Sequence, residues 1–216
     1  MRERRVLVAA CAVLWVLAPV ALAAARWPTW WTWIAPEQTP MTWLQSVVLI
    51  LASTGCLLLV VVLGRAGAPR VRIWLVFGAG LCLLALDERF AVHERVRDGY
   101  LAPRDVRVPF LPWVGPGDFL ILGVAVVGLV ALPFVWRAFA PDRAARAALV
   151  VGVVLAAVAV GADSIDPSRW SVGAERLEQT LEEVVELGSG LALACAVGLR
   201  LLGELGGRQR PPVTSE

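Results

Sequence analysis

Residues 182–202, EEVVELGSGLALACAVGLRLL, place three glutamates at the head of an apolar run that is long enough to cross a bilayer. A membrane-spanning helix needs about 20 mostly apolar residues. Ionisable side chains are costly in hydrocarbon, so within such a helix they indicate a functional site by default. This stretch therefore predicts both a membrane helix and the place where the protein acts.

The rest of the chain has the composition of a membrane protein. Its 216 residues are 58% hydrophobic and have a mean hydropathy of +0.71, which excludes an ordinary soluble domain. Besides Val184–Leu202, five apolar runs occur: Val6–Ala25, Thr42–Gly64, Val71–Leu86, Phe119–Phe139 and Ala145–Ala162. The third and fifth reach spanning length only if their helices continue into the polar residues that follow. We expect an all-α protein with six transmembrane helices in one bundle over residues 1–205, then a disordered cytoplasmic tail over 206–216.

The basic residues predict how the bundle is oriented. All of them are arginines. Arginines cluster before the first apolar run, after the second, after the fourth and at the end of the last, and in a six-span protein these four places lie on the same side of the membrane. Positive charge is retained on the cytoplasmic side of membranes, so both termini are expected in the cytoplasm. These arginines are Arg2, Arg4, Arg5, Arg65, Arg70, Arg72, Arg137, Arg143, Arg146, Arg200, Arg208 and Arg210.

Small residues predict which helices touch. They recur every four positions in the last run and in the fifth: Gly190, Ala194 and Gly198, and Ala148, Gly152 and Ala156. Such spacing lets helix backbones approach closely in lipid. The fifth and sixth spans are therefore expected to be the closest pair.

A second acidic cluster ends the third run and includes the chain's only histidine, His93. A rise of about 1.5 Å per helical residue, counted from the cytoplasmic arginines, brings Asp87, Asp163 and Glu186 to similar depths, roughly 21–25 Å from that side. Three separate helices should then bring polar groups to one layer near the outer surface. We expect an outward-facing acidic pocket in the outer leaflet, open to a lipid or small-molecule ligand.

The residue types in the two clusters suit one divalent metal ion, because imidazole and carboxylate groups bind zinc, iron and manganese. A helical di-metal site would use Glu-x-x-His on two helices, which this chain lacks. A single ion with a bound water predicts a metal-dependent membrane enzyme, hydrolytic in type, that acts on a lipid or extracytoplasmic substrate. The predicted ligands are Asp87, His93, Glu94, Glu182 and Glu186, and the predicted catalytic bases are Glu88 and Glu183.

Two other interpretations fit the same residues. Arginines on the outer side could pair with the acids, which would make the protein a non-enzymatic scaffold or complex subunit with a buried carboxylate–arginine network. Alternatively, Glu178, Glu182 and Glu186 could relay protons or cations, as in a proton- or cation-coupled transporter. The apolar inner halves of the spans offer no polar path for that relay. Nothing indicates nucleic-acid binding, and the oligomeric state stays open.

Three short motifs resemble those of bacterial multi-pass membrane proteins of unassigned function: Leu86-Asp87-Glu88, His93-Glu94 and Glu182-Glu183-x-x-Glu186. The resemblance implies a six-span protein of the bacterial inner membrane and brings no activity with it. A fainter likeness to membrane-embedded amidases of the alkaline ceramidase type implies a site among bundled helices. Those proteins bind zinc through several histidines, whereas this chain has His93 alone.

Overall fold

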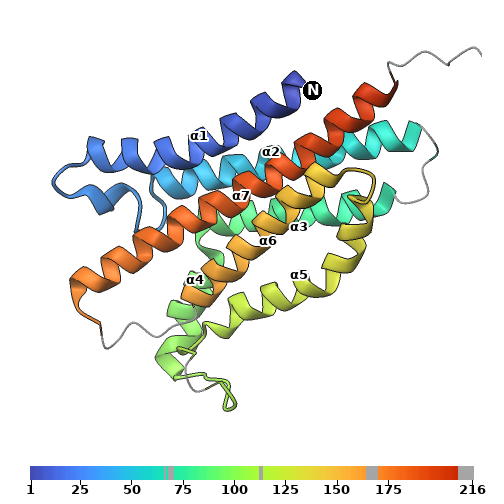
Figure 1. The fold of residues 1–216 in the computed structure, drawn as a ribbon. Helices are drawn as coiled ribbons and strands as arrows, with labels where there is room; N and C mark the ends of the chain where they lie inside the picture. The colour runs from blue at the N-terminus through green and yellow to red at the C-terminus, as the bar shows by residue number, and fades with distance from the viewer. Residues whose placement is uncertain (66, 68–70, 112–113, 164–169, 209–216) are drawn as a thin grey trace, which may run out of the picture.

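The computed structural model describes residues 1–65, 67, 71–111, 114–163 and 170–208. Of the predicted tail at 206–216, residues 206–208 belong to the last helix, and 209–216 lie outside the described residues. The described chain is all-helical (Figure 1). Its α-helices are α1 Arg2–Ala25, α2 Pro40–Arg65, α3 Val71–Phe90, α4 Val92–Val96, α5 Phe119–Ala138, α6 Arg143–Asp163 and α7 Val172–Arg208. Short 3₁₀ or π turns lie at η1 Trp30–Trp33, η2 Arg97–Leu101 and η3 Ala102–Arg104.

Within the described residues, five helices are long and apolar enough to cross a membrane, namely α1, α2, α5, α6 and α7, which indicates a multi-pass membrane protein. The third apolar run does continue into the following polar residues, because α3 extends to Phe90. This extension brings charged residues into the helix, because every 18-residue stretch of α3 contains Asp87 and Glu88 together with Arg72 or Arg89. Composition therefore sets α3 apart from the other five long helices.

Helix α7 runs through the middle of the bundle because three consecutive small residues let three helices approach it. Successive helical residues point about 100° apart, so neighbours in sequence face different partners. The indole of Trp15 in α1 covers Gly188, where an added Cβ would lie 2.6 Å from the ring. The Ser189 hydroxyl donates a 3.0 Å hydrogen bond to the Gly152 carbonyl of α6, and Gly190 packs against α2.

Although α2 and α3 contact each other to almost the same extent, the predicted close pairing of the fifth and sixth spans is present, because α6 and α7 pack extensively against each other (Figure 1). Gly152 permits it: a Cβ there would lie 2.8 Å from the side chain of Leu193. The glycines of α7 have other neighbours, since Gly188 and Gly198 contact α1 and Gly190 contacts α2. The four-residue spacing identified the close pair but not the helix that each glycine faces.

The two ends of the bundle differ in chemistry. At the end that carries the N-terminus, which we call the basic end, Arg4 Nη2 donates to both carboxylate oxygens of Asp142 at 2.6 and 2.7 Å. Nearby, Arg200 pairs with Glu204 and donates to the Ala138 carbonyl. The opposite end, which we call the acidic end, carries α4, the short turns and the first half of α7 (Figure 1).

Candidate functional site

All seven residues predicted for the site line one cavity at the acidic end, with a volume of about 480 Å³. These residues are Asp87, Glu88, His93, Glu94, Glu182, Glu183 and Glu186. Helices α3, α4, α6 and α7 contribute to the wall, and residues 35–37 and 115–118 add two loop segments. The expected convergence of distant acidic clusters is thus present in the fold.

The cavity is strongly acidic. Among the described residues, eleven carboxyl side chains line it, against two basic ones, Arg97 and His93. The acidic residues are Glu37, Asp87, Glu88, Glu94, Asp98, Asp118, Asp163, Glu178, Glu182, Glu183 and Glu186. Carboxylates that share a site disfavour one another's ionised form, so this arrangement favours bound protons or cations.

A break between α3 and α4 creates the closest pair in the site. Ala91 has φ +48°, a left-handed conformation that ends α3 and turns the chain back on itself. The Asp87 carboxylate then accepts the His93 backbone N–H at 2.9 Å through Oδ1 and lies 2.6 Å from the ring Nδ1 through Oδ2. Both oxygens of Asp87 are therefore committed to His93, which fixes the orientation of the imidazole.

Arg97 holds the other acids of the rim. Its guanidinium lies 3.3 Å from Glu94, 2.8 Å from Asp98 and 3.4 Å from Asp118, and a longer contact of 3.9 Å reaches Asp163 at the end of α6. One arginine thus ties α4 and η2 to the start of α5 and the end of α6. This is a carboxylate–arginine network of the kind that the scaffold interpretation expects, and it includes two acids of the predicted acidic region, Glu94 and Asp163.

The three glutamates that open the last apolar run have no such partner. Within the described part of the chain, no arginine forms an ion pair with Glu182, Glu183 or Glu186. Arg176, one helical turn or more before them, instead stacks on the Trp31 ring at 4.2 Å. Arg169, which also precedes these glutamates in the sequence, lies outside the described residues.

Glu183 is the most buried of these three glutamates. The residue is only 5% exposed, and its Oε2 atom has no hydrogen-bond partner among the described residues. Gln45 of α2 donates its amide N–H to the Glu183 backbone carbonyl at 2.9 Å, and the Gln45 side-chain oxygen is likewise without a donor. A buried carboxyl oxygen without a donor is costly unless it carries a proton or meets a cation.

Sequence reasoning missed three acids of the site, Glu37, Asp98 and Asp118, and it did not predict the central role of Arg97. Burial, followed by the charge of Glu94, raises the pKa of Glu37 to about 7. The only signal for Glu37 was that it is the single acid in the tryptophan-rich segment between the first two runs. Asp118 follows Gly117, whose φ of +91° and close approach to Arg97 require glycine.

The predicted metal ligands are near one another but do not form a ready-made metal site. Among the described residues, no three His, Cys, Asp or Glu side chains are arranged so that they could hold one metal ion. The donor set itself, one imidazole and several carboxylates, suits zinc, iron or manganese. The residue types therefore suit one of these metal ions, but the distances between their side chains do not form a site for it.

The Asp87–His93 pair makes a prediction about charge. Burial opposes the charged imidazole, but the hydrogen bond and charge of Asp87 outweigh it, so the pKa of His93 is raised above its ordinary value. Because the chain has one histidine, histidine-labelled protein gives a single imidazole NMR titration. We expect Asp87→Asn to lower the pKa of His93, because burial lowers this pKa and the carboxylate that raises it is then missing.

The sign of the linked stability follows from the raised pKa. The charged pair stabilises the fold at pH values below the unfolded histidine pKa of about 6.5, and that contribution is lost as the pH rises through the folded value. Asp98→Asn, which removes an exposed acid bonded to Arg97, is the control and should leave the titration unchanged. An unchanged pKa of His93 in Asp87→Asn would contradict the pairing.

Comparison with known proteins adds a family but no activity. No curated protein and no solved structure matches this chain. One family does match residues 2–201, which is nearly the whole chain, and it is described as a domain of unknown function, DUF8692. The chain belongs to this family.

Proposed function

We propose that the protein crosses the inner membrane of a bacterium six times, with both termini in the cytoplasm and the acidic cavity facing outward. Five candidate spans support this arrangement, and the 20 residues of α3 would cover about 30 Å, the thickness of the hydrocarbon core. Arg4 and Arg200 lie at the basic end together with the N-terminus. The positive-inside rule assigns that end to the cytoplasm.

In that orientation, we infer that the cavity binds a cation from the outer side of the membrane, and that the cation is a protonated organic amine. The observation that carries this proposal is the buried Oε2 of Glu183, which has no hydrogen-bond partner among the described residues. It lies in a cavity that these residues line with eleven carboxyl groups and two basic ones. An isolated internal charge is expensive in low dielectric, and a bound cation offsets it.

The spacing of the acids favours an amine over a bare ion. A metal ion needs several oxygen or nitrogen ligands at about 2.0–2.6 Å from one point, and no such group is present among the described residues. An ammonium group has three N–H donors that point in different directions. Its hydrogen bonds to carboxylates, about 2.7–2.9 Å between nitrogen and oxygen, are longer than metal–oxygen bonds. It can therefore bridge carboxylates on different helices that stand too far apart to share one metal ion.

A metal-dependent hydrolase is the second candidate, and the Asp87–His93 pair is the observation that favours it. Metal-binding histidines commonly hydrogen-bond a carboxylate through the ring nitrogen that does not face the metal. His93, Glu94, Glu182 and Glu186 would then hold one zinc, iron or manganese ion, with Asp87 orienting the imidazole. When bound, the ion would lower the pKa of a water molecule.

In this second candidate, Glu88 and Glu183 have the role of general base. Both line the cavity, and neither is bonded to an arginine among the described residues. An unpaired carboxylate beside the ion can accept a proton from water. An ion would also have to draw the ligands together, which makes this candidate more demanding than amine binding.

Calorimetric titration of the purified protein with spermidine tests the first candidate. We expect saturable binding that weakens at least tenfold in Glu182→Gln and in Glu186→Gln, because each removes one acidic group from the cavity. Glu175→Gln is the matched control, since Glu175 lies on the same helix but does not line the cavity. Its affinity for spermidine should equal that of the wild type.

Elemental analysis of the same preparation separates the two candidates. Stoichiometric zinc, iron or manganese that is lost in Glu182→Gln would favour the hydrolase and overturn the amine proposal. Spermidine binding by metal-free protein, sensitive to Glu182 and Glu186 but not to Glu175, supports the amine proposal. Metal-free protein that does not bind spermidine removes both.

A further inference from the structure

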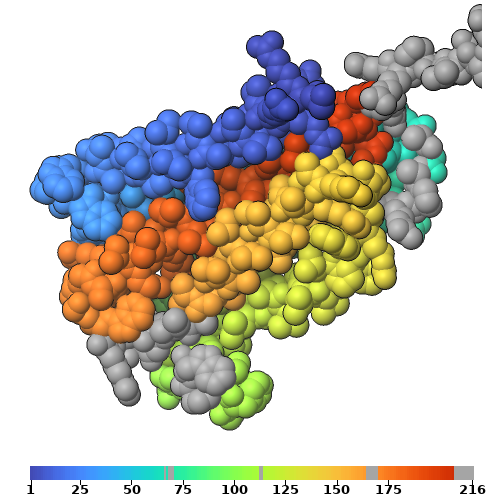
Figure 2. Space-filling model, viewed as in Figure 1, coloured from blue at the N-terminus to red at the C-terminus, as the bar shows by residue number. Residues whose placement is uncertain are grey.

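Helices α6 and α7 separate toward the acidic end and leave a groove between them. They touch closely where Leu193 packs on Gly152, and beyond that point they diverge, as Figure 2 shows on the face where both helices are visible. The groove has a volume of about 310 Å³. Pockets for small ligands span about 300–1,000 Å³, so the groove is large enough for part of a ligand.

The groove is lined almost entirely by hydrocarbon. Val158, Leu177 and Leu181 are 53%, 51% and 56% exposed, and the small side chains of Ala159 and Ala162 leave room between the helices. Both helices are candidate membrane spans. Exposed apolar surface between two spans opens toward lipid rather than toward water.

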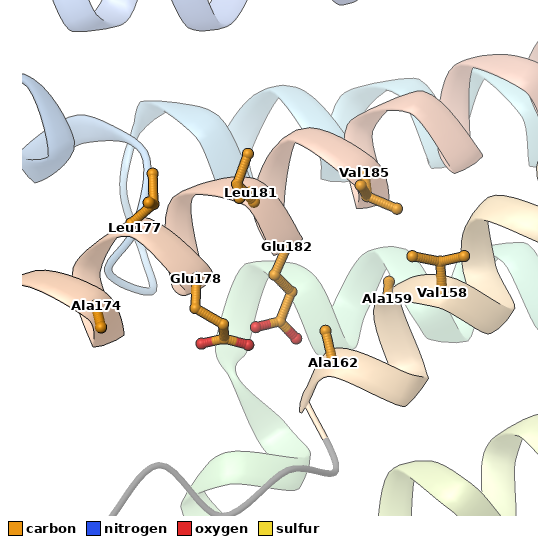
Figure 3. A pocket seen from close by; sticks show the side chains of 9 residues that line it. All are labelled: Val158, Ala159, Ala162, Ala174, Leu177, Glu178, Leu181, Glu182 and Val185. Atoms are coloured by element: carbon orange, nitrogen blue, oxygen red, sulfur yellow. The ribbon is translucent and has the colours of Figure 1, made fainter. Parts of the chain in front are cut away.

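Two glutamates connect this groove to the acidic cavity. Figure 3 shows Leu177 and Leu181 on one side of α7, with Glu178 and Glu182 on the other side and their carboxylates near Ala162. Glu178, Glu182 and Ala162 line the acidic cavity as well. The groove and the cavity therefore share a wall, and that wall is acidic.

The charge of this wall selects the ligand. Glu178 and Glu182 form no ion pair within the described chain. The acids Glu186, Asp163 and Glu178 line the same cavity as Glu182. A ligand that bridges groove and cavity must therefore be apolar along its length and positively charged at its head.

We propose that the α6–α7 groove admits a membrane amphiphile with a protonated amine head group, whose alkyl chain lies in the groove and whose amine meets Glu178 and Glu182. This proposal rests on the cation-binding cavity of the proposed function and names the class of ligand. The amphiphile reaches the cavity sideways from the bilayer, between the helices. A ligand from the bilayer needs no passage through the loops that cover the cavity.

Binding of dodecylamine, measured by native mass spectrometry of detergent-solubilised protein, tests the proposal. Dodecylamine should bind at least tenfold more tightly than dodecanol, which has the same chain without the charge. Val158→Trp fills the groove and should weaken dodecylamine binding at least tenfold while leaving spermidine binding unchanged. Val154→Trp, on the same helix, equally exposed and outside the groove, is the matched control.

A second variant guards against misfolding. Leu181→Trp fills the groove from α7 and should have the same effect as Val158→Trp, and unchanged spermidine binding in both shows that the cavity is intact. If both variants bind dodecylamine as Val154→Trp does, the groove proposal is wrong although amine binding stands. If the wild type binds neither amine, the proposed function itself fails. A change of oligomeric state in Val158→Trp would assign the groove to a second copy of the chain and overturn the proposal.

Discussion

Arg97→Met should lower the free energy of unfolding by about 2 kcal/mol at neutral pH. Removing one partner of a buried ion pair costs about 3–5 kcal/mol, and the partial exposure of Arg97 reduces that figure. The Arg97 side chain is 23% exposed and forms ion pairs with Glu94, Asp98 and Asp118. Methionine keeps much of the length of the side chain but leaves these carboxylates facing one another.

The loss of stability in Arg97→Met should increase with pH. Burial raises the pKa of Glu94 even though Arg97 opposes the shift, so without Arg97 the pKa rises further. A carboxyl group with a raised folded pKa stabilises the fold below its unfolded pKa of about 4.3, and this contribution is lost as the pH rises through the folded value. The deficit of Arg97→Met relative to the wild type should therefore be smallest near pH 4 and grow toward pH 7.

Thermal unfolding in detergent across this pH range measures the effect, with Arg95→Met as the matched control. Arg95 lies on α4 two residues away, and its side chain is exposed. Surface arginines contribute about 0–1 kcal/mol, so Arg95→Met should unfold close to the wild type at every pH. Equal melting temperatures for the two variants would show that Arg97 does not hold the rim together.

The part of the site that could be predicted lies on regular helices. A constant rise per residue fixes depth, which is why Asp87, Asp163 and Glu186 could be brought to one layer from their distances to the arginines. The structure places all three in the wall of one cavity. Hydrophobic runs likewise located each long helix, because a helix that crosses a bilayer must be apolar over a fixed length.

The part that could not be predicted depends on irregular backbone. Glu37 and Asp118 come from loops, where no period relates sequence distance to position in space. His93 lies against Asp87 because Ala91 adopts a left-handed conformation. A residue other than glycine seldom adopts that conformation, so the sequence around Ala91 does not predict it. Arg97 became the centre of the rim for the same reason, since it follows that break.

Helix α7 shows the limit of hydropathy within a regular element. The apolar run begins at Val184, but the helix begins at Val172, because its first turns are polar on one side and apolar on the other. Leu177 and Leu181 lie on one side of α7, and Glu178 and Glu182 lie on the other, the side toward Ala162 (Figure 3). An amphipathic extension of this kind is recognised by its periodicity and not by mean hydropathy.

At the basic end, Asp142→Asn should lower the free energy of unfolding by about 2 kcal/mol at neutral pH, since hydrogen bonds to charged groups contribute about 1.5–3 kcal/mol. The Asp142 side chain is 7% exposed and accepts both hydrogen bonds from Arg4. Its Oδ1 also accepts the Ala145 N–H at 3.0 Å, which caps α6. Asparagine keeps an oxygen for the cap, so Asp142→Ala should cost about 1 kcal/mol more.

The pKa shift of Asp142 at this end has the opposite sign to that of Glu94 at the acidic end. Burial works against ionisation of Asp142, but the hydrogen bonds from Arg4 outweigh it, and the pKa of Asp142 is lowered. Its contribution is therefore present above the unfolded pKa of about 3.9 and is lost as the pH falls through the folded value. The gap between wild type and Asp142→Asn, measured by thermal unfolding, should close in acid because the wild type then loses the charged Arg4–Asp142 interaction. The gap for Arg97→Met should close in acid for a different reason, because protonation of Glu94 relieves the variant of an unpaired charge.

Asp105→Asn is the control for Asp142→Asn because it removes an ion pair of the same type from an exposed position. Asp105 lies 2.7 Å from Arg107, and its side chain is 74% exposed. Exposed pairs contribute about 0–1 kcal/mol, so this variant should unfold near the wild-type temperature. If Asp142→Asn behaves like Asp105→Asn, Arg4 and Asp142 do not join α1 to the start of α6. The basic end must then be held by its apolar contacts, among them the Trp74 and Phe139 rings 4.9 Å apart.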